Sequence, residues 1–270
     1  MACYRVLARG FGVAVQWSGA LAAENRGATE SPDLWRNRRE LCVDDFLFSS
    51  VRGLEWRLGE PRSAGVALAL DRPWEGRFGG AYLTVLHTPA GYQMYYRGMA
   101  GEAERDAVTC YAESEDGITW TRPNLGLFEV MGTRDNNIVL PPGEPHFATH
   151  NFSVCYDGRP GVPADERYKA VGGGAGPAEA LAAAGTEHAL YRFVSADGKR
   201  WRLFSPEPLF TGYALDSQNV LTWVPAEQCF AIYLRMWADD VPGNPASYRG
   251  VRTIARATAR AKRSRQARSV

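Results

Sequence analysis

The stretch YAESEDGITW at residues 111–120 returns in altered form as YRFVSADGKRW at residues 191–201. Both copies contain the pattern Ser-x-Asp-Gly-x-x-Trp, in which Asp-Gly is a strong turn signal and the tryptophan lies on the return strand. A strand, a turn and a return strand that recur at long spacing indicate a modular β architecture. We therefore expect Asp116 and Asp197 to hold the turns, and Trp120 and Trp201 to pack between modules.

The composition agrees with a modular β protein. With 270 residues, 45% of them hydrophobic and 23% charged, the chain has enough apolar material for a sizeable core in one or two domains, which excludes a disordered protein. Its 28 glycines, 16 prolines and 11% aromatic residues favour short strands joined by turns over long helices. The composition predicts an all-β fold.

Charge is distributed unevenly along the chain. The net charge is +1, yet residues 249–270 contain eight basic residues and no acidic one, so the preceding part is mildly acidic. A basic tail can bind nucleic acid by releasing counterions. Because no aromatic stacking platform or recognised motif beyond Tyr248 accompanies it, we predict no nucleic-acid partner.

The cysteines and histidines form no metal or redox pattern. The five cysteines are far apart and include no C-x-x-C pair, and the four histidines lack the i, i+4 pairing of a helical metal site. His146 and His150 are four residues apart, but Pro145 and its neighbours argue for a loop. The sequence predicts no metal and no other cofactor.

The first residues have features of a leader. Residues 1–23 combine arginines, a partly apolar stretch and a small-residue pattern, and so resemble a secretory signal. Polar residues at 16–18 interrupt the apolar stretch, which favours an irregular leader and a cytoplasmic over a secreted location. No apolar run approaches the ~20 residues that a membrane span requires.

Strand signals fall into modules of four, which is the pattern of a propeller blade. A hairpin is expected ahead of the modules, at residues 41–48 and 54–58. The predicted strands of the two complete modules are 81–86, 92–97, 107–113 and 119–122, then 152–156, 167–171, 189–194 and 201–204.

A third module begins at residues 219–224 and continues with 229–237 and about 250–258. The chain then ends in the basic segment 259–270, without the expected turn, tryptophan and fourth strand. We therefore predict an irregular leader (1–40), an incomplete propeller of about two and a half blades plus the hairpin (41–258), and a basic tail (259–270). An unclosed ring leaves an exposed sheet edge unless another chain covers it, and the sequence leaves the oligomeric state open.

Eight segments together are similar to the five-bladed β-propeller glycoside hydrolases, in particular to bacterial proteins that resemble glycoside hydrolase families 32 and 43. The segments are LCVDDFL (41–47), DRPWEG (71–76), YQMYYRG (92–98), YAESEDGITW (111–120), DNNIVL (135–140), HNF (150–152), ERYKA (166–170) and DSQNV (216–220). The likeness covers residues 41 to about 258. Members of this group are typically longer, so the chain is expected to be truncated relative to them.

The resemblance implies a glycan or oligosaccharide substrate and a pair of carboxyl groups, one acting as acid and the other as nucleophile or base. In a propeller, the start of each innermost strand faces the central pocket. Glu75, before the first of these strands, and Asp216, before the third, are the predicted catalytic carboxylates. Each could instead be structural, Glu75 as a loop acid and Asp216 in a local Asx turn.

Other polar residues near the same strand starts are predicted to bind the sugar. Trp74 could stack on a sugar face, and His150 and Asn151 could hydrogen-bond its hydroxyls. The structural alternatives are that Trp74 packs in the core, that Asn151 caps a turn and that His150 is a surface residue. Gln218 and Asn219 belong to a polar row that a buried strand would not tolerate without partners. The alternatives remain a non-catalytic glycan-binding or interaction module, and an inactive fragment.

Overall fold

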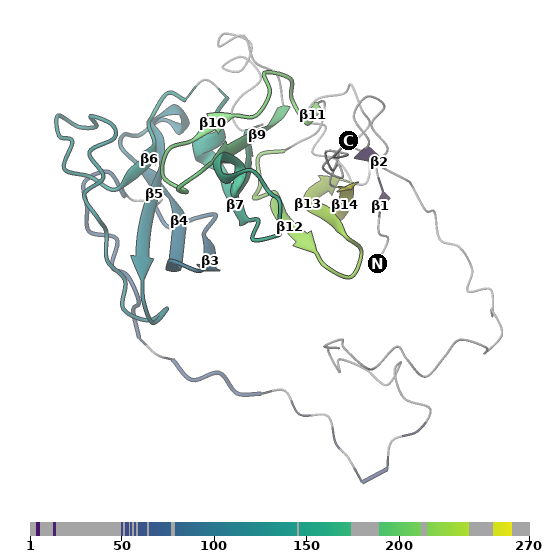
Figure 1. Cartoon of the computed structure of the whole chain (residues 1–270). Coiled ribbons are helices and arrows are strands. Elements are labelled where there is room, and N and C mark those ends of the chain that lie inside the picture. Colours follow the sequence, from purple (N-terminus) through teal and green to yellow (C-terminus); the bar gives the residue numbers. More distant parts are fainter. Residues whose placement is uncertain are drawn as a thin grey trace, which may run out of the picture. The chain divides into compact units, whose positions relative to one another are not determined.

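Figure 1 shows the computed structural model of the chain. The structure describes residues 4–5, 13–14, 50, 52–76 except 54, 56, 58 and 64, then 79–144, 146–173, 189–211, 215–237 and 251–260. The chain divides into two compact units, one of residues 20–66 and one of residues 1–19 with 67–270. All described strands belong to the second unit, and the described residues contain no α-helix. The prediction of an all-β fold is confirmed.

The first sheet is built from four consecutive antiparallel strands. Its order is β3 (Thr84–Thr88), β4 (Gly91–Met99), β5 (Ala107–Ser114) and β6 (Ile138–Leu140) (Figure 1). The short 3-10 helix η2 (Glu104–Asp106) joins β4 to β5.

The predicted fourth strand at residues 119–122 is wrong, because Thr121 forms only an isolated bridge with Glu113. β6 takes that place, and its three apolar side chains are at most 6% exposed. Residues 119–122 offer a single large apolar side chain, so pairing β5 with β6 removes more apolar surface from water.

The second sheet has the order β10-β9-β8-β7, with β11 also paired to β9. The predicted strands of this module lie within a few residues of those observed. Between them lie two 3-10 helices, η3 (Ala148–His150) and η4 (Ala164–Glu166). The strands are β7 (Ser153–Tyr156), β8 (Tyr168–Gly173), β9 (Ala189–Ser195), β10 (Arg202–Leu203) and β11 (Phe210–Thr211).

The third sheet contains β12 (Val220–Val224), β13 (Cys229–Trp237) and β14 (Arg252–Arg260), all antiparallel. The sequence predicts no fourth strand here, but two short strands from the start of the chain pair with β14. They are β1 (Tyr4–Arg5), which is parallel to β14, and β2 (Val13–Ala14), which is antiparallel to it. Both lie in the predicted irregular leader.

The predicted hairpin and tail are only partly described. Residues 41–48 and 261–270 lie outside the described residues, and residues 52, 53, 55 and 57 form no strand. Residues 259 and 260, assigned to the tail by the sequence, belong to β14.

Three clusters of buried side chains hold the sheets. One joins the first sheet to the second and includes Tyr95, Phe152 and Tyr168. A second joins the second sheet to the third, with Leu190 and Leu234 almost fully buried. The third covers the opposite face of the first sheet with residues from the segment before β3 and from the loop between β5 and β6, among them Trp74, Trp120 and Phe128.

The two Asp-Gly turns share the same hydrogen bonds from the aspartate to the backbone. Asp116 Oδ1 accepts the backbone N–H groups of the second and third residues after it, at 2.8 and 2.7 Å, and Asp197 Oδ1 does the same at 2.8 Å each. The following glycines have φ of +75° and +73°, a left-handed conformation that favours glycine. These contacts bear out the structural role predicted for the two aspartates.

The two tryptophans of the motif have different surroundings. Each indole Nε1–H donates to the carbonyl of the turn glycine, at 3.2 Å for Trp120 and 3.1 Å for Trp201. Trp201 packs against Tyr95 of the first sheet and Phe152 of the second, as predicted. Trp120 packs instead on the loop-covered face of the first sheet.

Candidate functional site

Polar side chains gather where the first strands of the three sheets begin. β7 lies beside both β3 and β12, and the residues that precede these strands contact residues of β4 and β13. We call this group the strand-start cluster. It consists of Tyr82, Arg97, His150, Asp216, Gln218 and Arg235.

His150 contacts three other members of the strand-start cluster. Its ring nitrogens are 3.4 and 3.5 Å from Arg97 Nη1, its ring centroid is 5.4 Å from that of Tyr82, and it hydrogen-bonds the Asp216 backbone. Burial and then the Arg97 charge lower the pKa of His150 from its usual 6.5 to about 4, although Asp216 acts in the opposite direction. His150 is therefore neutral at pH 7. A neutral imidazole has one N–H donor, which the Asp216 backbone accepts, and one acceptor nitrogen.

The depressed pKa of His150 predicts a pH-dependent stability. The unfolded chain binds a proton at His150 below about pH 6.5, whereas the folded chain does so only near pH 4. The contribution of His150 to stability is therefore fully present above pH 6.5 and decreases as the pH falls toward 4. Between pH 7 and pH 5 we expect the unfolding free energy to fall by about 2 kcal/mol because of this group. Urea unfolding at pH 7 and pH 5 measures it, and His150→Gln should flatten the profile by that amount. Equal slopes in both proteins would contradict the prediction.

Asp216 is the carboxylate of the strand-start cluster. It forms an ion pair with Arg235 of β13, in which Nη2 contacts Oδ1 and Nη1 lies 3.4 Å from Oδ2. The Asp216 side chain is 29% exposed and the Arg235 side chain 14%. The carboxylate is thus held by a cation and still reaches the surface, as a group that acts on a substrate must.

Gln218 ties the third sheet to the first. Its Nε2 donates to Leu83 O and to Thr84 Oγ1, both at 3.2 Å. The predicted sugar-binding residue is therefore part of the cluster, but its amide N–H groups are occupied by protein.

Asn151 and Asn219, also predicted to bind sugar, are both fully buried. Asn151 Nδ2 lies 2.7–3.1 Å from three carbonyl oxygens, of Gly173, Leu215 and Ser217, and its Oδ1 accepts the Gly173 N–H at 2.9 Å. Asn219 Nδ2 donates to the same Leu215 oxygen at 2.9 Å. Both amides fasten the segment before β12, and the structure favours a structural over a ligand-binding role for them.

Glu75, the other predicted catalytic carboxylate, lies within the first sheet's loop-covered cluster and is 0% exposed. Its carboxylate accepts hydrogen bonds from Tyr96 Oη at 2.7 Å, from Arg122 Nη1 at 2.8 Å and from the Arg72 N–H at 2.8 Å. Among the described residues, no hydrogen bond or ion pair joins it to Asp216. This geometry supports the structural alternative for Glu75.

Trp74 is likewise enclosed by protein. It is 7% exposed, and its Nε1–H donates to Asn137 Oδ1 at 2.8 Å. The indole therefore presents no open face on which a sugar could stack.

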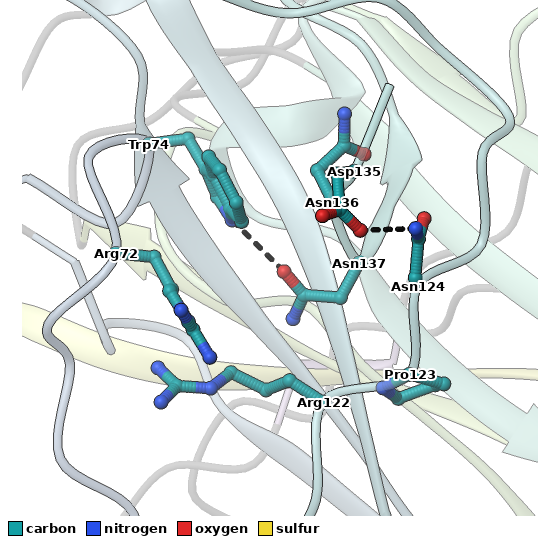
Figure 2. Close-up of a pocket in the computed structure, with 8 residues that line it drawn as sticks. All are labelled: Arg72, Trp74, Arg122, Pro123, Asn124, Asp135, Asn136 and Asn137. Atoms are coloured by element: carbon teal, nitrogen blue, oxygen red, sulfur yellow. Dashed lines mark hydrogen bonds between the residues drawn. The ribbon is translucent and has the colours of Figure 1, made fainter. Parts of the chain in front are cut away.

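Figure 2 shows a small pocket beside these residues, with a volume of about 100 Å³. In this view the Arg72 and Arg122 side chains lie on one side, a hydrogen bond joins Trp74 to Asn137, and Asn124 faces Asp135. Two amide side chains of the lining, those of Asn136 and Asn137, already have their hydrogen bonds to protein. Asn136 bonds Phe128 O, Thr133 O and the Ile138 N–H. Asn137 bonds the Tyr96 hydroxyl, Tyr111 O and the Trp74 N–H. The pocket has room for a few waters and belongs to the scaffold.

The described residues contain no group of three or more side chains suited to a metal ion. In the same part of the chain, no helix has the length and hydropathy that a membrane span requires.

Sequence reasoning missed three members of the strand-start cluster: Tyr82, Arg97 and Arg235. Arg97 and Arg235 lie on the second strand of their modules, and only strand pairing brings them opposite the starts of β3 and β12. The available signal was a charged residue near the end of an otherwise apolar strand, in YQMYYRG (92–98) and CFAIYLRMW (229–237).

No protein-family model and no curated protein sequence matches the chain. Among solved structures it is similar to a proposed glycosidase from Bacteroides thetaiotaomicron, with 14% identity and a TM-score of 0.42 over 68% of this chain and 50% of that one. A glycosyl hydrolase from Bacteroides ovatus has 13% identity and a TM-score of 0.41 over 68% and 48% of the two chains. A structure from work on the GH130 family of mannoside phosphorylases and glycoside hydrolases has 15% identity and a TM-score of 0.38 over 66% and 45%. The chain thus spans about half the length of these similar structures.

Proposed function

We propose that this chain is a glycan-acting protein of the glycoside hydrolase type, and that the strand-start cluster contacts the sugar. We further propose that its three sheets are blades of a five-bladed type of propeller, as the sequence resemblance implies. The observation that carries the proposal is the meeting of a part-exposed carboxylate, a neutral histidine and an aromatic ring at the starts of neighbouring strands.

The chemistry of this group suits a carbohydrate. Asp216 supplies a carboxylate that can exchange a proton with, or stabilise charge on, a glycosidic bond. His150 offers a hydrogen-bonding ring without charge, and Tyr82 offers a phenol. Sugars present hydroxyl groups and apolar C–H faces, which these side chains match.

A non-catalytic glycan-binding module is the second candidate, and one observation favours it. Hydrolysis requires two carboxyl groups about 5 to 10 Å apart, yet Glu75 is enclosed with Arg122 and Tyr96 and is 0% exposed. In this alternative the strand-start cluster would hold a sugar without cleaving it.

The test combines hydrolysis and binding. The purified chain is assayed on 4-nitrophenyl glycosides of mannose, glucose, galactose, xylose and arabinofuranose, and on an oligosaccharide array. If the protein is a hydrolase, Asp216→Asn should lower kcat at least a hundredfold, because general acid–base or nucleophilic catalysis contributes about that much or more. Glu102→Gln, at an exposed acid in the β4–β5 loop, is the matched control and should leave kcat unchanged.

The outcomes separate the candidates. Hydrolysis that is lost in Asp216→Asn supports the enzyme. Array binding without hydrolysis supports the binding module. A folded chain that neither binds nor hydrolyses any of these sugars contradicts both.

A further inference from the structure

The backbone around Tyr82 departs from the regular ladder of the first sheet. β3 and β4 pair regularly from Thr84↔Tyr95 onward, but Arg97 N–H donates to Ala81 O at 3.2 Å and Arg97 O accepts the Gly80 N–H at 2.7 Å. β4 runs from Tyr95 to Arg97 in two steps, whereas the paired segment runs from Thr84 back to Ala81 in three. The segment before β3 therefore contains an extra residue relative to β4. An extra residue of this kind is a bulge, and bulges re-aim side chains and are common beside active sites.

Tyr82 adopts a conformation that tyrosine ordinarily avoids. Its φ is +53°, in the left-handed region that glycine adopts without steric cost. A non-glycine residue held in this region is strained, and such strain is concentrated at sites where function fixes the side chain. Phe147, which precedes η3 and His150, has a φ of +55° and shows the same feature on the neighbouring strand start.

The bulge places the Tyr82 ring among the groups of the strand-start cluster. The Arg97 guanidinium lies 5.1 Å from the ring centroid and the His150 ring 5.4 Å from it, at 46°. The side chain is half-buried. Among the described residues, the Tyr82 hydroxyl has no hydrogen-bond partner, so it remains available both to donate and to accept.

We propose that Tyr82 is a sugar-contacting residue, which the bulge aims so that its ring edge and hydroxyl meet one hydroxyl-bearing sugar unit beside Asp216. This inference rests on the proposed function. It assigns to Tyr82 the aromatic contact with sugar that the sequence predicts for Trp74. The strained backbone is then the cost of holding that ring in place.

Two substitutions at this position separate contact from packing. Tyr82→Phe keeps the ring and removes the hydroxyl, whereas Tyr82→Gly removes the side chain and relieves the left-handed backbone. Met131→Gly is the matched control, because Met131 has a φ of +52° and lies in an exposed turn outside the strand-start cluster.

We expect Tyr82→Phe to raise KM, or the dissociation constant, about fivefold and to leave kcat within twofold. Tyr82→Gly should weaken kcat/KM or affinity more than tenfold, while its thermal midpoint is equal to or above that of the parent chain. Met131→Gly should show the same thermal effect with unchanged activity. The probe is the 4-nitrophenyl glycoside, or the array oligosaccharide, on which the parent chain gives its highest signal.

Two results would overturn the inference while the proposed function stands. Both Tyr82 variants could bind and act like the parent. Tyr82→Gly could lose stability and affinity together while Tyr82→Phe changes nothing, which is the pattern of a packing residue. Failure of the proposed function is distinct, because then the parent chain itself neither binds nor hydrolyses any probe, and the sugar-contacting role of Tyr82 falls with it.

Discussion

Glu75→Ala is expected to lower the free energy of unfolding by about 4 kcal/mol. The substitution leaves the Arg122 guanidinium, whose side chain is 13% exposed, without its enclosed carboxylate, and it removes the acceptor of the Tyr96 hydroxyl and of the Arg72 N–H. Breaking a buried ion pair costs more than the pair contributes, because the remaining charge stays desolvated. Chemical denaturation monitored by tryptophan fluorescence measures the change.

Two companion variants define the origin of this loss. Glu75→Gln keeps the shape and one acceptor oxygen, so about half of the loss should remain. Asp71→Asn removes the other acid that contacts Arg122, but the Asp71 side chain is 65% exposed, so less than about 1 kcal/mol should be lost. If Glu75→Ala unfolds at the same denaturant concentration as the parent, Glu75 does not have this structural role, and the result would favour its predicted catalytic role.

Asn151→Asp is expected to cost about 3 kcal/mol or more, although it changes only one NH₂ group to an oxygen. The replaced Nδ2 lies between the carbonyl oxygens of Gly173, Leu215 and Ser217, and the site is fully buried. An oxygen there faces three acceptors without a proton to share, and a carboxylate adds an unpaired buried charge. The segment before β12, which carries Asp216 and Gln218, should loosen together with the fold.

The measurement is the thermal midpoint at pH 7, together with hydrogen exchange of residues 215–219. Asn124→Asp is the matched control, because Asn124 is exposed and its amide contacts Asp135 at the surface. The control should cost less than about 1 kcal/mol, through exposed charge repulsion alone. Equal midpoints for the two variants would show that Asn151 does not fasten the segment before β12.

Local sequence signals predicted the repeated turns and most strands well. Asp-Gly followed by Trp is a signal whose bonds close within a few residues, so its structure follows from its own residues. The strands of the second sheet and β12 and β13 of the third are short apolar runs bounded by turn residues, and such runs carry their own boundaries.

The fourth strand of the first sheet illustrates where such reasoning fails. Residues 119–122 directly follow a turn and were the nearest choice, whereas β6 lies some way further along the chain. Pairing is decided by the surface that each candidate buries against the sheet, which is a property of the assembled core. The same limit applies to β1 and β2, which pair with β14 from the opposite end of the chain.

Three of the residues that the sequence singled out, His150, Asp216 and Gln218, lie together in the strand-start cluster. Polar residues beside apolar strands are visible in the sequence, but the contacts that join them are not. The sequence indicated Trp74 and Glu75 as site residues just as strongly. A Trp-Glu pair looks the same in a sequence whether the acid faces a ligand or, as here, the Arg122 side chain. Burial and partners distinguish the two cases.

The sequence by itself determined the all-β class, the strands of the second sheet and the two Asp-Gly turns, because these depend on contacts between residues close together in the chain. The tertiary structure alone decided that Glu75 is enclosed by Tyr96 and Arg122, that Asp216 pairs with Arg235, and that Tyr82 meets His150 and Arg97. These contacts join residues between 15 and 68 positions apart, and the free energy that selects them comes from packing sheets together. A chain of the same local pattern could bury a different acid and expose a different ring.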